Sequence, residues 1–239
     1  SNRTSYFHQS VGGYNPAKLH RFQDLIDRKI AQEIKTFAAY INDAEGDMSK
    51  VPGDSIAPVL NMLNAKYVIF GNRENQVVMN PYANGNGWFV GKIDFAKDAD
   101  AEMLAMQTLD TKSAAVADER FRQVLDGSPL DSGSVELKTR EANKLTYEVT
   151  TGRGGVAVFS EVYYPGWEAS IDGKPSELGR VNYILRAMRI PAGKHVVELR
   201  YEPASVATSE TVAFVAIGVM LLVFVLAVFF SVRRGRKEK

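Results

Sequence analysis

The 239-residue sequence contains no cysteine and only three histidines. The missing cysteines exclude disulfides, thiolate metal sites and a cysteine nucleophile in this sequence, so its folded part has to be held together by core packing. His8, His20 and His195 lack the spacing of a metal site such as His-Glu-x-x-His. A serine nucleophile is not indicated either, because there is no Gly-x-Ser-x-Gly elbow. We therefore predict no catalytic residue, no bound metal and no cofactor in this sequence.

Charge is nearly balanced, with a net charge of +1. Residues 233–239 alone contribute five cations and one anion, so the rest of the sequence is slightly acidic. That balance is not typical of a protein that binds the phosphates of nucleic acid. We expect no nucleic-acid partner.

One long apolar run dominates the C-terminal end. Residues 212–232 include no charged side chain. As a helix they would be roughly 31 Å long at about 1.5 Å per residue, which matches a hydrocarbon core of about 30 Å. The run predicts a transmembrane helix, with the lipid bilayer as a partner. The basic residues 233–239 predict a cytoplasmic tail, which places the chain before residue 211 outside the cytoplasm.

The sequence opens at Ser1 with no targeting segment ahead of the polar residues that follow. An external region whose single crossing is its last element needs an earlier export signal or earlier spans. We expect the sequence to be the C-terminal piece of a longer membrane protein, with the upstream transmembrane core of the same protein as a partner.

Residues 1–126 are predicted to form an extracytoplasmic α+β unit. Apolar residues recur at three and four positions between Pro16 and Ala44, which indicates an amphipathic helix. Short strands are indicated at 65–70, 77–79, 88–90 and 114–116. Asp98 or Asp100 is expected to cap a helix that runs to Met106.

Residues 126–134 are rich in Gly, Ser, Asp and Pro and are predicted to be a linker. Beyond it the apolar period changes to two, and six or seven short strands predict an antiparallel β-sandwich over 134–203. Asp172-Gly173 indicates a two-residue hairpin turn. Glu161 and Arg186 are expected to form a cross-strand ion pair. The fold class is thus α+β: a mixed unit, a sandwich and one transmembrane helix.

Two groups of side chains are candidate ligand-binding residues. The first is a polar group around the start of the long helix, where the cations and the helix N-terminus could attract a phosphate, although a solvated helix face explains them too. The second is an aromatic set that could stack on a sugar ring, although aromatics at strand positions beside a proline more often serve core and corner packing. The groups are His8, Tyr14, Lys18, Arg21 and Asp24, and Tyr163, Tyr164, Trp167 and Tyr183.

Several stretches of the sequence resemble the YfhO family of bacterial membrane proteins. They include SYFHQSVGGY, LNMLNAKYVI, GNGWFV, FSEVYYPGW and NYILRA. The resembling segments are residues 5–14, 17–25, 60–69, 80–81, 85–90, 159–167, 171–174, 182–187 and 190–195.

The resemblance implies a polytopic glycosyltransferase of the GT-C type in the bacterial cytoplasmic (inner) membrane. Such an enzyme would transfer sugar from a polyprenyl-phosphate carrier to a cell-envelope glycan. Its catalytic acid would lie in an early external loop upstream of this sequence, which would form an accessory domain on the acceptor side. The alternative is a non-catalytic, membrane-anchored carbohydrate-binding or assembly module.

Asp98-Ala99-Asp100 matches the Asp-x-Asp of metal-dependent glycosyltransferases, but helix capping explains it as well. Donor sugar and acceptor polymer are not indicated.

Overall fold

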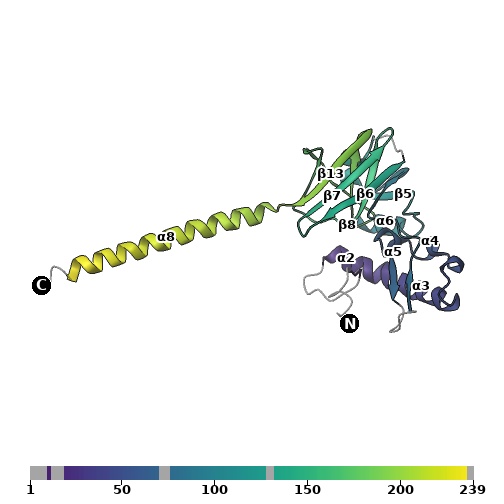
Figure 1. The fold of residues 1–239 in the computed structure, drawn as a ribbon, viewed down its shortest axis with the longest axis horizontal. Helices are drawn as coiled ribbons and strands as arrows, with labels where there is room; N and C mark the ends of the chain where they lie inside the picture. The colour runs from purple at the N-terminus through teal and green to yellow at the C-terminus, as the bar shows by residue number, and fades with distance from the viewer. Residues whose placement is uncertain (1–9, 12–18, 70–75, 128–131, 236–239) are drawn as a thin grey trace. The chain divides into compact units, whose positions relative to one another are not determined.

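The computed structural model describes residues 10–11, 19–69, 76–127 and 132–235 (Figure 1). The predicted site residues His8, Tyr14 and Lys18 lie outside these ranges. The chain divides into two compact units. One comprises Ser1–Tyr164 with Glu168–Arg200, and the other Pro165–Trp167 with Tyr201–Lys239.

The first unit begins with the predicted amphipathic helix. It runs through α2 (His20–Leu25), a π-helical stretch η1 (Ile26–Ile30) and α3 (Ala31–Asp43). Most of its apolar stripe is buried, including Leu25, Ile30, Phe37 and Ile41, but Ile34 is 50% exposed. The stripe packs in one core with residues of the short elements that follow. These are η2 (Met48–Lys50), α4 (Gly53–Ile56) and α5 (Pro58–Met62).

A six-stranded sheet draws strands from both sides of the predicted linker. Its order is β3-β8-β12-β11-β5-β4. The first part of the chain provides β3 (Gly87–Val90), β4 (Lys92–Ala96) and β5 (Ala114–Asp118), and the later part provides β8 (Gly155–Val162), β11 (Gly179–Val181) and β12 (Leu185–Ile190). β4 and β5 are parallel, with α6 (Ala99–Ala105) between them in sequence. Residues 1–126 and 134–203, which the sequence divides, therefore share one sheet.

Two short helical elements, η4 (Glu119–Phe121) and α7 (Arg122–Leu125), follow β5 directly. Leu125 is almost completely buried beneath β11, where a Cβ added to Gly179 would meet the Leu125 side chain at 2.9 Å. The absence of a side chain at Gly179 therefore lets α7 pack closely on the sheet.

A five-stranded antiparallel sheet has the order β10-β9-β13-β7-β6. Its strands are β6 (Gly133–Arg140), β7 (Lys144–Thr151), β9 (Trp167–Ile171), β10 (Lys174–Ser176) and β13 (Gly193–Tyr201). The predicted hairpin turn is confirmed, because Asp172 and Gly173 both have positive φ, 51° and 76°, between the paired strands β9 and β10. Both residues of a type I′ turn require this conformation.

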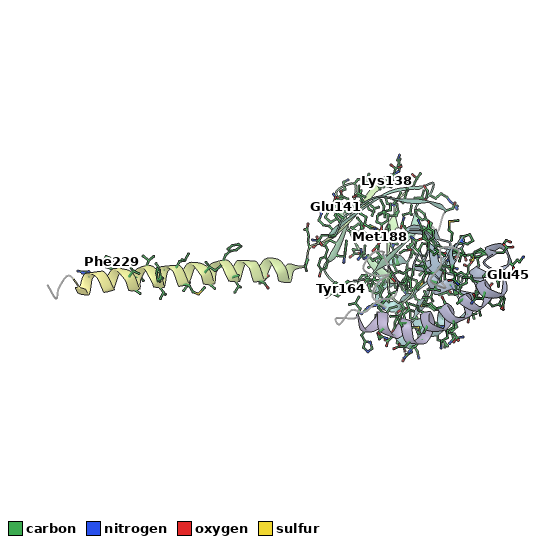
Figure 2. The ribbon with its side chains drawn as sticks, turned by 60° about the horizontal axis from the view of Figure 1, so that its bottom comes forward. Glu45, Lys138, Glu141, Tyr164, Met188 and Phe229 are labelled. Atoms are coloured by element: carbon green, nitrogen blue, oxygen red, sulfur yellow. The ribbon has the colours of Figure 1, made fainter. Side chains whose placement is uncertain are left out.

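The two sheets contact each other as the predicted sandwich requires. Tyr147 of β7 and Phe159 of β8 are completely buried, and their rings meet edge to face with centroids 4.8 Å apart. Met188 of β12 lies among packed side chains in the interior (Figure 2). The α+β fold class with sandwich-like sheets is confirmed.

The second unit contains α8 (Ala204–Gly235), drawn as one helix in Figure 1. Within it, Val212–Phe229 has a mean hydropathy of 3.1, and none of this stretch is buried inside the protein. Phe229, labelled in Figure 2, is 54% exposed. The helix is long and apolar enough to cross a membrane, as the sequence predicts.

Candidate functional site

The candidate site centres on Glu102, a completely buried carboxylate near the start of α6. Asp98 fixes the start of this helix, because its side chain accepts a hydrogen bond from the backbone N–H of Ala101 at 2.8 Å. One turn further on, Glu102 turns inward on the face that also buries Met103. The predicted Asp98 cap is therefore confirmed, and the same helix carries a buried acid that was not predicted.

Three donors converge on the Glu102 carboxylate. Arg180 of β11 donates from Nη2 to Oε2 at 3.0 Å, and the backbone N–H of Tyr183 donates to Oε1 at 2.9 Å. Arg21 of α2 donates from Nη1 to Oε2 at the longer distance of 3.4 Å. Burial raises the pKa of Glu102, and the positive charge of Arg180 opposes that effect.

Arg180 is 3% exposed, and its environment combines charge and an aromatic face. A second carboxylate, that of Asp118, lies 3.4 Å from its Nη2. Its guanidinium also lies 5.2 Å from the centre of the Phe121 ring. Burial lowers the pKa of Arg180. This residue joins the end of β5 to α6 through a buried charge network.

The turn between β11 and β12 holds Tyr183 in place. Asn182 and Tyr183 both have positive φ, 48° and 71°. Asn182 is fixed by Val116, since its N–H donates to the Val116 carbonyl at 2.7 Å and its Oδ1 accepts from the Val116 N–H at 3.0 Å. Asn tolerates this conformation, but for a bulky residue such as Tyr it is strained by roughly 1–2 kcal/mol. The bond from Tyr183 N–H to Glu102 stabilises that strained turn.

The outer edge of the site joins residues of both predicted groups. Arg21 lies over the Tyr183 ring, 4.5 Å from its centre, and the Tyr183 hydroxyl donates to Asp24 Oδ2 at 3.0 Å. The side chains of Arg21 and Asp24 are 31% and 25% exposed. The Tyr183 cluster, defined as Arg21, Asp24, Glu102, Arg180 and Tyr183, therefore runs from a buried acid to a partly exposed cation and acid.

The other aromatic candidates are Tyr163, Tyr164 and Trp167. Tyr163 is half-buried with its ring edge against Phe121, at a centroid distance of 5.6 Å. Tyr164 is 42% exposed. Within the second unit, Trp167 lies beside Tyr201, with ring centroids 5.6 Å apart. Tyr163 and Trp167 therefore pack against different aromatic rings.

The Asp-x-Asp motif has a structural explanation at both positions. Asp98 caps α6, and Asp100 forms an exposed ion pair with Arg28 at 3.0 Å. Among the residues that the structure describes, no group of three or more His, Cys, Asp or Glu side chains is arranged to hold a metal ion.

Glu161 has a partner that the sequence did not indicate. Arg140 of β6 donates from Nη2 to Glu161 Oε1 at 2.6 Å. Arg186, predicted as the partner, is 3% exposed and donates from Nε to the carbonyl of Val162 at 3.0 Å. A register shift between Leu185 and Arg186 moves Arg186 opposite Phe159. The negative charge of Glu161 still acts on Arg186 and partly offsets the burial that lowers its pKa to about 10.

The arrangement has a limited chemical repertoire. Arg21 offers a partly exposed cation, and Asp24 offers a partly exposed acceptor beside it, held by the hydroxyl proton that the buried Tyr183 donates. These groups suit an anionic or hydroxyl-rich ligand at the rim. Glu102 is completely buried, and its carboxylate already accepts hydrogen bonds within the protein. Its role is therefore to hold Arg180 and the Tyr183 turn in position.

Comparison with models of protein families gives a match. Residues 114–213 fit the model of the family described as Bacterial membrane protein YfhO. The comparisons with curated proteins and with solved structures gave no match. The matched region begins at β5, includes Arg180 and Tyr183, and ends at the start of the membrane-capable stretch of α8. Over these residues the chain is similar to that family of membrane proteins.

Proposed function

We propose that this chain is the extracytoplasmic C-terminal region of a polytopic, GT-C-like glycosyltransferase in the bacterial cytoplasmic membrane. The whole protein would transfer sugar from a polyprenyl-phosphate carrier to a cell-envelope glycan. In this proposal the catalytic acid lies upstream, and the folded unit ahead of α8 supports the acceptor side.

The family match is the observation that carries the proposal, because it extends from the sandwich into a helix that can span a membrane. The basic residues after that helix favour a cytoplasmic C-terminus, which leaves the sheets outside the cytoplasm. A lipid-linked sugar donor is used at that face of the membrane. The partly exposed Arg21 is a suitable contact for the phosphate of such a carrier.

The test is sugar transfer by the full-length protein in membrane vesicles supplied with a radiolabelled polyprenyl-phosphate sugar. We expect Arg21→Ala to lower transfer at least tenfold. Arg28→Ala serves as the matched control, because Arg28 lies on the same continuous helix and its guanidinium forms an exposed ion pair with Asp100. The proposal fails if vesicles with and without the protein incorporate equal label.

The second candidate is a non-catalytic, membrane-anchored module that binds carbohydrate. The exposed Tyr164 favours it, since an accessible ring can stack on a sugar. Glycan-array binding that is lost in Tyr164→Ala and in Trp167→Ala, with both variants folded, would support this module. Transfer activity that depends on Arg21 would support the enzyme instead.

A further inference from the structure

The hairpin of β1 (Tyr67–Ile69) and β2 (Val77–Met79) has an exposed apolar face. The two strands form a separate two-stranded sheet in which Tyr67 pairs with Met79 and Ile69 pairs with Val77. Paired residues point to the same side, and residues two apart do so as well. The outer face of the hairpin, defined by these four side chains, is exposed by 66% at Tyr67, 62% at Met79, 53% at Ile69 and 44% at Val77.

The opposite side of the hairpin is its anchor to the fold. Val68 and Val78 pair with each other and pack against the main core. The hairpin is therefore anchored to the fold through its inner face, and this anchoring does not involve the outer face. In contrast, outward residues of β6 include Glu136 and Lys138, as expected for a strand that meets water. Four large apolar side chains on one side indicate a non-aqueous partner.

The area of this face is too small for a stable contact between two proteins. Each strand has three residues, so the face is about 10 Å long and two strands wide. That corresponds to the order of 100–200 Å², whereas a standard interface buries about 800 Å² on each partner. A second copy of the chain is therefore a poor occupant. The contact has to be weak and assisted by a tether.

The chain provides such a tether to the lipid bilayer. β13 ends at Tyr201 and the membrane-capable stretch starts at Val212. Of the ten residues between them, 204–211 belong to α8, and even a fully extended segment of this length would reach at most about 35 Å. The first unit thus stays close to the bilayer surface, which raises the effective concentration for a weak second contact.

The composition of the hairpin suits the membrane interface. Lys66, just before β1, is exposed and is the sole charged residue among the described positions 66–69 and 76–79. A cation there is attracted to anionic headgroups, and Tyr is enriched at the headgroup level of membranes. We propose that the outer face of the hairpin inserts into the headgroup–acyl boundary of the bilayer that α8 crosses. The proposal rests on α8 crossing the membrane and is independent of sugar transfer.

The absence of cysteine allows a direct test with single-cysteine variants of the full chain. Met79→Cys would carry an environment-sensitive fluorophore in proteoliposomes that contain phosphatidylglycerol. Leu104→Cys is the matched control, because Leu104 is an apolar residue on α6 with a nearly equal exposed fraction of 63%. We expect a lipid with a shallow nitroxide to quench the label at residue 79 at least twofold more than the label at residue 104. Aqueous iodide should quench the two in the opposite order.

Three results would overturn the proposal. Equal access of iodide to both labels would show a hairpin in water. A label at residue 79 shielded from both quenchers would show a protein partner. Strong lipid quenching of both labels would show that the whole unit lies on the bilayer with no special role for the hairpin. Ile69→Cys repeats the measurement at a second position of the same face, and the fluorescence of the buried Trp88 confirms that each variant is folded.

Discussion

Glu102 and Arg180 form an ion pair with 3.0 Å between Oε2 and Nη2, and their side chains are 0% and 3% exposed. Removing one partner of such a pair leaves the other charge buried without compensation, which is far more costly than losing a pair on the surface. The pair also connects α6 to β11 and to the strained Tyr183 turn. It is therefore expected to be the most sensitive polar contact of the Tyr183 cluster.

Glu102→Gln should lower the free energy of unfolding by up to about 3 kcal/mol, because Arg180 keeps its charge in the interior and retains only the longer 3.4 Å contact with Asp118. Chemical unfolding of the full chain in detergent, followed by Trp88 fluorescence, measures the loss. Asp100→Asn is the control on the same helix, since Asp100 is 86% exposed in its pair with Arg28. It should cost less than about 1 kcal/mol. Equal losses in the two variants would contradict a dominant buried pair.

The pattern of the sequence predicted most elements of this fold but not how they combine. Alternation at Leu145, Tyr147 and Val149 predicted a half-buried strand, and these residues are buried as β7. Periodicity does not encode which strands become neighbours. β5 pairs with β11 through Val181 and Ala117, 64 positions apart, so the shared sheet could not be predicted from local patterns.

The candidate site shows the same limit. Arg21, Asp24 and Tyr183 were predicted in two separate groups, and the structure brings them together across 159 positions between Asp24 and Tyr183. Glu102 was not predicted as a site residue, because an acidic residue in the first turn of a helix is favoured by the helix dipole and needs no other explanation. Its position on the same helix face as Met106 was the signal that it points inward.

Glu33 gives the stability a specific pH dependence. Its carboxylate caps α5 by accepting hydrogen bonds from the N–H groups of Val59 and Leu60 at 3.1 and 2.9 Å. Burial nevertheless raises its pKa from an ordinary 4.5 to about 7. Between these two values the folded state holds a proton that the unfolded state has lost, so stability falls as the pH rises from 4.5 to 7. The total change is on the order of 3 kcal/mol.

Glu33→Gln should remove this slope, because an amide does not titrate. Unfolding free energies at pH 5 and pH 7.5 provide the measurement. The variant should lose stability at pH 5, where it forfeits one of the two capping bonds, and lose less or none at pH 7.5. A slope that persists in the variant would assign the pH dependence to another group.

His195 contributes a second pH dependence at higher pH. Its Nδ1 lies 2.7 Å from Asp172 Oδ2 at the β9–β10 turn, and this hydrogen bond raises the pKa of His195 above 6.5. A raised folded pKa means that the stabilisation is complete below pH 6.5 and is lost as the pH rises through the folded pKa. His195→Gln should therefore lower the melting temperature more at pH 6 than at pH 9. An equal decrease at both values would show that the imidazole acts only by packing.

Gly53 is predicted to be intolerant of even one extra carbon. It is buried at the start of α4, and a Cβ at this position would overlap the ring of Tyr82. That ring cannot easily move, because the Tyr82 hydroxyl donates to the carbonyl of Val51 at 2.7 Å. Gly53→Ala should lower the free energy of unfolding by about 1–3 kcal/mol through overpacking.

Gly91→Ala is the matched control for this prediction. Gly91 joins β3 to β4, and a Cβ there would lie 3.6 Å from the Ser113 carbonyl, an ordinary van der Waals contact. Its effect should stay within about 0.5 kcal/mol. If Tyr82→Phe restores stability to Gly53→Ala, the ring is confirmed as the obstacle, because without the hydroxyl bond it can shift. A Gly53→Ala variant as stable as Gly91→Ala would show that the α4 turn can move away from Tyr82.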